Sequence, residues 1–356
     1  MKHTFYKRSW LSRIFGTRYI GLDISDHYIR YAEVKKRDTF VYPVSYGKYK
    51  IPNGVISSGK ILNSESLRKI LTSIRTRIKT RYVRVSIPSG HVTLFTAHIK
   101  RVHQKNLNKT IQAQLRSSIP NADKFLFDFS ILTTDNDGYD VQVYLMPKIV
   151  IQGYLDVLRQ SGFTPLTFEA NTEALSRAVI SPQDDGTHML VDIGDHESTL
   201  SIVKNRIPLY SSTFDFGGTA LVNTIKEKLS VDSERAEYIK NKQGVGKNDM
   251  YEDMPGILLG HISLLRDEIN EHVLSWSLEK NDSEKTRTAI NKIMLSGPHA
   301  GIPGLAEYLT VSLRRDVEPA KIWDHLLSFD ERIPQMNRKD ALAYATAIGL
   351  ALGGLE

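Results

Sequence analysis

The chain has 356 residues, of which 41% are hydrophobic and 24% charged, the composition of a globular protein large enough for two lobes. The absence of cysteine excludes disulfides, thiolate metal sites and a cysteine nucleophile. The formal net charge is +7. No nucleic-acid motif accompanies the basic residues, so we expect solvated basic surfaces and no nucleic-acid partner.

No apolar stretch approaches the roughly 20 residues that span a bilayer, and the N-terminus lacks the apolar core of a signal peptide. We therefore expect a cytoplasmic protein. Residues 1–17 are basic and also carry Trp10, Leu11, Ile14 and Phe15. This pattern fits a frayed tail as well as a segment that lies on a membrane surface.

The residues after this tail predict the first lobe. We expect a hairpin at about 18–35, a strand at 39–44 and a loop at 49–62. Ser64 is expected to cap a helix that runs to Arg77, and a short strand at 83–87 ends at Pro88.

A strand–helix–strand–strand–helix order follows and predicts a small α/β insert. Its expected elements are a strand at 91–100, a helix ending before Pro120, strands at 127–133 and 141–147, and a helix at 149–160. Residues 167–181 then resume the first lobe with a helix.

The second lobe opens with a hairpin at 188–203 and a strand at 208–214. Helices are expected after Gly217-Gly218, at 234–241 and at 257–279. The alanines of a final helix at 340–352 favour close packing against another helix or a sheet. The whole division is a tail at 1–17, lobe one at 18–88 and 166–185, the insert at 89–165, lobe two at 186–335, and a C-terminal helix at 336–356 that returns to lobe one.

One pattern occurs twice, half a chain apart. Gly21-Leu-Asp-Ile-Ser-Asp-His27 and Leu190-Val-Asp-Ile-Gly-Asp-His196 each run from an apolar strand through an aspartate into a short polar turn. Such a repeat predicts two hairpins that face each other across a cleft, with turn N–H groups on a polyphosphate. Asp23 and Asp192 would then hold a hydrated metal ion.

A third stretch, Lys292–Leu309, reads as strand, glycine-containing turn and helix, which lets a backbone approach a nucleoside. The order and spacing of the three pieces resemble the phosphate-1, phosphate-2 and adenosine motifs of the actin, sugar-kinase and Hsp70 superfamily. The expected fold class is therefore α/β, an actin-like ATPase fold of two duplicated lobes with a small insert in lobe one.

From about Tyr19 to Gly353 the chain resembles the type IV pilus assembly protein PilM family, which is related to the division protein FtsA. The stretches that carry the resemblance lie in both lobes and in the insert. They are the proline-glycine loop Ile51–Leu67, Val85-Ser-Ile-Pro88, Gln112–Pro120, Met146-Pro-Lys148, Phe214-Asp-Phe-Gly-Gly218, Glu234–Lys240 and Tyr344–Ala351.

The resemblance implies an FtsA-type insert, binding of ATP with Mg²⁺, and a scaffold role at the cytoplasmic face of the inner membrane. The family captures the N-terminal tail of the bitopic protein PilN in a groove between lobe one and the insert. Other pilus platform proteins and self-association are further expected partners, and the membrane is reached through the partner.

The site residues that follow from the motifs and the resemblance form three groups. For the nucleotide they are Asp23, Ser25, Asp26, Asp192, Gly194, Ser198, Gly217, Gly218, Glu237, Lys240 and Gly297, with Asp23 and Asp192 also on the metal. For the partner groove they are Val83, Val85, Ile87, Pro88, Ile119 and Pro120. No catalytic residue is assigned.

Three turns depart from the family pattern. The two hairpin turns carry Asp26 and Asp195 where hydroxyl and glycine residues are usual, and in the third turn Pro298-His299 replaces glycines. Two carboxylate charges about 4 Å apart repel by roughly 1 kcal/mol in water and by more in a dry cleft. The site is therefore either an ATP site or a degenerate one in a fold kept for protein binding.

Three function classes remain open. The first is a peptide-capturing scaffold with little or no ATPase activity. The second is a kinase or ATPase, which would need a general base near the γ-phosphate. The third is a polymerising protein like FtsA. A degenerate scaffold of a related secretion system is a variant of the first.

Overall fold

The computed structural model describes residues 18–37, 40–245, 254–278, 288–327 and 336–355. The basic tail expected at 1–17 lies outside these residues. The chain divides into two compact units: unit 1 takes its described residues from Met1–Ala178, Ile207–Tyr210 and Thr346–Glu356, and unit 2 from Val179–Arg206 and Ser211–Ala345. No helix in the described part of the chain is long and apolar enough to cross a membrane.

Unit 1 is built on a five-stranded sheet in the order β10-β6-β1-β2-β3. β1 pairs antiparallel with β2 and parallel with β6, and β6 pairs parallel with β10. The strands are β1 (Ile20–Ile24), β2 (Tyr28–Arg37), β3 (Phe40–Lys50), β6 (Tyr82–Ile87) and β10 (Thr164–Ala170), with a small ribbon of β4 (Ile56–Ser57) and β5 (Lys60–Ile61) beside them.

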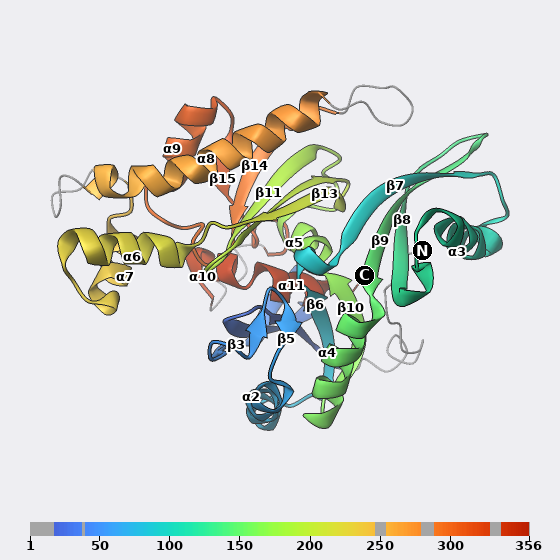
Figure 1. Ribbon diagram of the computed structural model, residues 1–356, viewed down its shortest axis with the longest axis horizontal. Helices are drawn as coiled ribbons and strands as arrows, with labels where there is room; N and C mark the ends of the chain where they lie inside the picture. Colours follow the sequence, from blue (N-terminus) through green and yellow to red (C-terminus); the bar gives the residue numbers. More distant parts are fainter. Residues whose placement is uncertain (1–17, 38–39, 246–253, 279–287, 328–335, 356) are drawn as a thin grey trace. The chain divides into compact units, whose positions relative to one another are not determined.

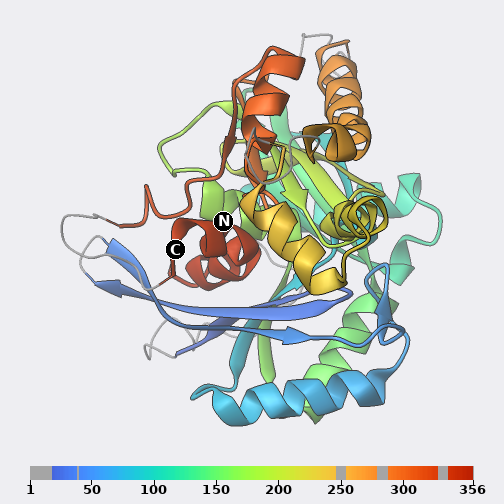
Figure 2. The same cartoon turned by 90° about the vertical axis from the view of Figure 1, so that its left-hand side faces the viewer.

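Helices cover both faces of this sheet (Figures 1 and 2). α2 (Ser64–Arg77) and α4 (Lys148–Gln160) pack against each other below it, and their apolar residues join the core of β1, β6 and β10. α11 (Ala345–Leu352) lies on the opposite face, next to α5 (Asn171–Val179).

The insert is a second, smaller sheet with a core of its own. Its strands, in the order β7-β9-β8, are β7 (Thr93–Lys100), β9 (Gly138–Pro147) and β8 (Phe125–Thr134). α3 (Leu107–Ser118) packs Leu107, Ile111 and Leu115 against them (Figure 1). The short 3-10 turns η1 (Ser89–His91), η2 (Gln104–Asn106) and η3 (Ala122–Lys124) complete it.

Unit 2 repeats the strand arrangement of unit 1. The strand order of its sheet is β13-β12-β11-β14-β15. β11 pairs antiparallel with β12 and parallel with β14, just as β1 pairs antiparallel with β2 and parallel with β6. The strands are β11 (Thr187–Ile193), β12 (Ser198–Lys204), β13 (Ile207–Phe214), β14 (Lys292–Ser296) and β15 (Val317–Pro319). The helices are α6 (Gly218–Leu229), α7 (Ser233–Lys242), α8 (Met254–Leu278), α9 (Leu305–Leu313) and α10 (Arg338–Ala343).

Four local expectations differ from the structure. Residues 164–170 form strand β10, so the helix expected within 167–181 begins only at Asn171. Helix α4, expected in the insert, packs in the core of the five-stranded sheet. Asn63, not Ser64, caps α2, because its side chain accepts the Ser66 N–H. The final helix is interrupted at Tyr344, whose N–H bonds to Ala341 O and closes α10.

The alanine-rich α11 approaches its neighbours at backbone distance. A Cβ atom at Gly21 would lie 1.9 Å from Ala347 O, and one at Gly349 would lie 1.7 Å from Ala174 O. Real carbon and oxygen atoms cannot come so near, so the two glycines let α11 lie directly on β1 and α5. The sequence-based expectation of close helix packing here is explained by these contacts.

We expect Gly349→Ala to destabilise unit 1 by about 1–3 kcal/mol, because the added methyl group must displace a helix backbone. The matched control is Gly260→Ala in α8, where a Cβ would meet nothing within 4 Å. That change should stabilise its helix by about 1 kcal/mol. Urea unfolding of both variants measures the two changes in the free energy of unfolding. Changes of the same sign would contradict the packing described.

A buried carboxylate joins three elements of unit 1. Glu169 at the end of β10 is 1% exposed and forms ion pairs with Arg84 of β6 and, at 2.8 Å, with Arg177 of α5. Arg177 also donates to Gly349 O of α11 at 2.8 Å. Burial alone would raise the pKa of Glu169, but the charges and hydrogen bonds of both arginines outweigh it and lower the pKa from 4.5 to about 2.

We expect Glu169→Gln to cost about 3–5 kcal/mol at neutral pH, because it leaves two buried guanidinium groups without their anion. Since the folded-state pKa is depressed, the contribution of Glu169 is complete above about pH 4.5 and is lost as the pH falls toward 2. Wild type should therefore lose stability over this range more steeply than the variant. Urea titrations at several pH values measure the difference.

The control for this prediction is Glu65→Gln on α2, whose carboxylate is exposed beside Lys69. Exposed ion pairs contribute little, so this variant should unfold like wild type. A Glu169→Gln protein as stable as wild type would show that the arginines find other partners.

Candidate functional site

The first hairpin turn is closed by its own residues. Ser25 N–H and Ser25 Oγ both donate to Tyr28 O, each at 3.0 Å. The Asp26 carboxylate accepts the backbone N–H groups of Ser58 and Gly59, the latter at 2.8 Å, and so holds the loop between β4 and β5. The negative charge of Asp26, which is unfavourable beside a triphosphate, is thus bonded to backbone amides within unit 1.

Asp23 lies at the end of β1, where its Oδ1 accepts a hydrogen bond of 2.7 Å from Ser86 Oγ. Burial raises the pKa of Asp23, and the Ser86 hydrogen bond and the charge of Arg30 only partly oppose this. A bound cation would lower that pKa, so the position suits a metal ligand chemically. The second predicted ligand, Asp192, belongs to unit 2, and the described residues contain no group of three His, Asp or Glu that could hold a metal. The Mg²⁺ site stays a prediction.

The second hairpin turn is bonded to the start of α6. Gly218 N–H donates to Gly194 O at 3.0 Å, and Thr219 N–H donates to Asp195 O at 2.9 Å. A Cβ at Gly217 would lie 2.4 Å from Asp195 O, which explains the glycine. Ser198, expected on the nucleotide, is 1% exposed and donates to Phe216 O. Its hydroxyl is therefore part of the fold rather than of a ligand surface.

Gly297 follows β14 with φ of +92° and packs on the end of β11. A Cβ there would lie 2.6 Å from Asp192 Oδ1 and 2.5 Å from Ile193 O. The structure thus brings the turn at 194–197, the glycine pair 217–218 and the turn at 297–299 together in unit 2. Their assignment to a nucleotide stays a prediction.

A chain of polar side chains links these turns to α7. Lys240 is fully buried and its Nζ lies 2.8 Å from Glu237 Oε1 and 3.0 Å from His299 Nδ1. The other ring nitrogen, Nε2, lies 3.0 Å from Asp195 Oδ1. An ammonium group has only donors, so His299 Nδ1 must accept and the ring proton sits on Nε2, from which it donates to Asp195.

The pKa directions agree with this assignment. Burial lowers the pKa of His299, and Lys240 lowers it further, although Asp195 opposes them. Burial also lowers the pKa of Lys240, against the hydrogen bond and charge of Glu237. The lowered pKa of His299 favours a neutral imidazole, and the carboxylates of Glu237 and Asp195 favour the charged form of Lys240 against its burial.

The residues of unit 2 in this arrangement do not fit a bound nucleotide. The His299 ring lies on Gly218, where a Cβ would be 2.3 Å from three ring atoms. Lys240 already has two partners, and Pro298 has no N–H to offer. Sequence reasoning noticed Asp195 and His299 as departures, but the 104 residues between them hid their contact.

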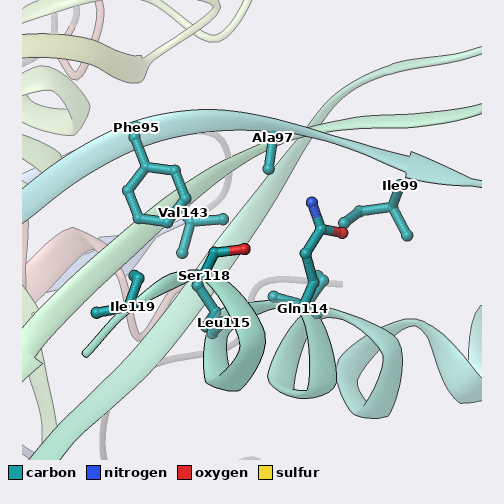
Figure 3. A pocket seen from close by; sticks show the side chains of 9 residues that line it. Phe95, Ala97, Ile99, Gln114, Leu115, Ser118, Ile119 and Val143 are labelled. Carbon is teal, nitrogen blue, oxygen red and sulfur yellow. The ribbon is translucent and has the colours of Figure 1, made fainter. Parts of the chain in front are cut away.

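The insert holds a cavity that is lined in part by Ile119 of the predicted partner groove. It measures about 50 Å³ and lies between β7, β9 and α3 (Figure 3). Its lining is apolar except at the α3 rim and consists of Phe95, Ala97, Ile99, Ile111, Gln114, Leu115, Ser118, Ile119 and Val143. A second cavity of about 70 Å³ on the other side of α3 shares Leu115 and Ile119.

The predicted groove residues fall into two classes. Val83, Val85 and Ile87 are fully buried in the core of unit 1, so they present no side-chain surface to a partner, and that part of the prediction is wrong. Their side chains join the core that α2 and α4 pack against, and β6 is an interior strand because β10, which was not foreseen, pairs with it. Pro88 is half-buried, Pro120 is exposed, and Ile119 lines both cavities.

The remaining cavity residues were missed from the sequence. Phe95, Ala97 and Ile99 alternate along β7, and Ile111, Leu115 and Ser118 recur at helical spacing on α3. Those periodicities mark one face of each element. They do not show that the two faces leave a space between them.

The chain is similar to known proteins over most of its length. The family model for type IV pilus assembly protein PilM matches residues 21–355. A structure described as the PilM-PilN type IV pilus biogenesis complex has a TM-score of 0.74 at 20% identity, covering 95% of this chain and 98% of that one. MreB5 of Spiroplasma citri bound to ADP has a TM-score of 0.57 at 13% identity, covering 93% of this chain and 94% of the other.

The ethanolamine utilization protein EutJ from Carboxydothermus hydrogenoformans aligns over 94% of this chain and 89% of its own, with a TM-score of 0.54 at 13% identity. Each of these three likenesses covers at least 93% of this chain. The chain belongs to the PilM family of type IV pilus assembly proteins and has an actin-like fold.

Proposed function

We propose that the protein is a scaffold of type IV pilus assembly that captures the N-terminal cytoplasmic tail of a PilN-type membrane protein. The observation that carries the proposal is the match to the PilM family over residues 21–355. The likeness to a PilM chain solved in complex with PilN supports the choice of partner. Association with the cytoplasmic face of the inner membrane, through that partner, is part of the same proposal.

The insert cavity is the site we propose for the tail. β7 is an edge strand of its sheet, so an extended peptide has a row of backbone groups to pair with. An apolar side chain of the tail would enter the cavity beside Phe95 and Leu115, and Ile119 would flank it. Main-chain pairing would supply affinity, and the cavity would select the side chain.

ATP with Mg²⁺ is implied by the family and by the fold, and an MreB5 structure with ADP supports it. The bonded chain from Asp195 to Lys240 opposes it. The proposed scaffold role therefore has no step that requires a nucleotide. Contacts with other pilus platform proteins, self-association and FtsA-like polymerisation are secondary proposals, which sedimentation with and without ATP would test.

We expect Ser118→Trp to abolish tail binding, because an indole at the rim would fill the cavity beneath it. Ser118 is exposed on α3, so the change should not disturb folding. The measurement is fluorescence polarisation of a labelled peptide that carries the N-terminal cytoplasmic residues of the PilN-type partner. A loss of affinity of about a hundredfold is expected if a central anchor is excluded.

The matched control is Ser117→Trp, which adds the same ring one residue away. Ser117 is also exposed but lines neither cavity, so its affinity should equal that of wild type. If both variants bind normally, the tail lies elsewhere on the protein. If neither wild type nor variants bind, the tail-capture proposal fails.

A further inference from the structure

In unit 2, two of the residues that depart from the family pattern bond to each other. Asp195 stands in the hairpin turn and His299 in the turn after β14, and their side chains meet at 3.0 Å. The opposite side of the ring bonds to buried Lys240 at 3.0 Å. Asp195 and His299 therefore belong to one hydrogen-bonded group, which also includes Lys240 of α7.

The position of the ring matters as much as its bonds. It lies flat against Gly218, where an added Cβ would meet Cγ, Cδ2 and Cε1 of His299, each at 2.3 Å. Gly217 and Gly218 stand at the N-terminus of α6, where the N–H groups of Gly218 and Thr219 already bond to the hairpin turn. Without the ring, a ligand could approach Gly218 from the side on which a Cβ would project. The ring covers that backbone, and the bonds at both nitrogens hold it there.

We propose that His299 plugs unit 2 against nucleotides and is the residue that keeps the nucleotide affinity of this chain low. A nucleotide must break the bonds of His299 with Asp195 and Lys240 before it reaches Gly218. The apparent affinity is reduced by the fraction of molecules in which the plug is open. This inference is independent of tail capture, since the insert cavity is formed by residues of unit 1.

Removal of the ring should open the site without removing a nucleotide-binding group. In His299→Gly, Gly218 is uncovered and Lys240 keeps its bond of 2.8 Å to Glu237. Glycine at this position also restores the residue type that the family prefers. We expect His299→Gly to bind ADP and ATP, each with Mg²⁺, at least about tenfold more tightly than wild type, because two hydrogen bonds no longer oppose entry.

The experiment is calorimetric titration of the full chain with each nucleotide. The control is His261→Ala, which removes a histidine of α8 whose ring meets Thr224 at 3.3 Å, outside the chain of bonds. That variant should bind like wild type. The tail peptide should bind all of these proteins equally. Failure of the tail-capture proposal can therefore be distinguished from failure of the proposal that His299 blocks nucleotide binding.

Two further variants separate a plug from simple charge repulsion. Asp195→Asn removes the negative charge but keeps an oxygen that accepts from Nε2, so a plug predicts little gain. Asp195→Ser removes the hydrogen bond to His299, so a plug predicts a clear gain in nucleotide affinity. If urea titration shows that His299→Gly is unfolded, Asp195→Ser tests the same prediction. Micromolar or tighter binding by wild type, no gain in His299→Gly, or a larger gain in Asp195→Asn than in Asp195→Ser would overturn the proposal.

Discussion

The architecture of unit 1 depends on one buried negative charge. Glu169 is almost fully removed from solvent, yet the two arginines beside it keep it ionised. Through them it connects β10, β6 and α5, and Arg177 extends the connection to the backbone of α11. Residues as far apart along the chain as Arg84 and Gly349 are joined in this way. A buried ion pair of this kind contributes less to net stability than to a single arrangement of its partners.

The two halves keep the same strand order but stabilise their hairpin turns differently. In unit 1 the turn carboxylate, Asp26, receives backbone N–H groups from the loop at 58–59. In unit 2 the corresponding carboxylate, Asp195, accepts a hydrogen bond from Nε2 of His299. The shared topology is a constraint of the fold. The turn chemistry has diverged between the two halves, and each solution gives a partly buried carboxylate a hydrogen-bond donor.

Local patterns predicted most of the fold. The two hairpins, the helix at 64–77 and the insert strands follow from periodicity and from turn residues, and the repeat of an aspartate after an apolar strand indicated the duplicated lobes. β10 was missed because Thr-Pro-Leu-Thr-Phe lacks a clear alternation and is buried on both faces, as parallel strands are. Without β10, the strand at 83–87 looked accessible. Glu169 was overlooked for the same reason.

The site was less predictable than the fold. Gly217, Gly218 and Gly297 were assigned to nucleotide binding, which stays a prediction, and the structure shows that each approaches other residues of unit 2 too closely for a Cβ atom. No local pattern indicated the partners of Asp26, Ser198 or His299, which lie 18 to 104 residues away along the chain. Hydrogen bonds between distant segments depend on how sheets and helices pack. A single sequence does not encode that packing in any local pattern.

The loop held by Asp26 has a mechanical consequence for the insert. Gly59 in this loop accepts a hydrogen bond of 2.8 Å from the hydroxyl group of Tyr154 in α4. α4 begins directly after β9, the central strand of the insert sheet. A displacement of the first hairpin turn would therefore pull on the helix in which β9 continues. One carboxylate, one loop and one tyrosine thus connect the turn between β1 and β2 to the helix that follows the module that we propose receives the partner.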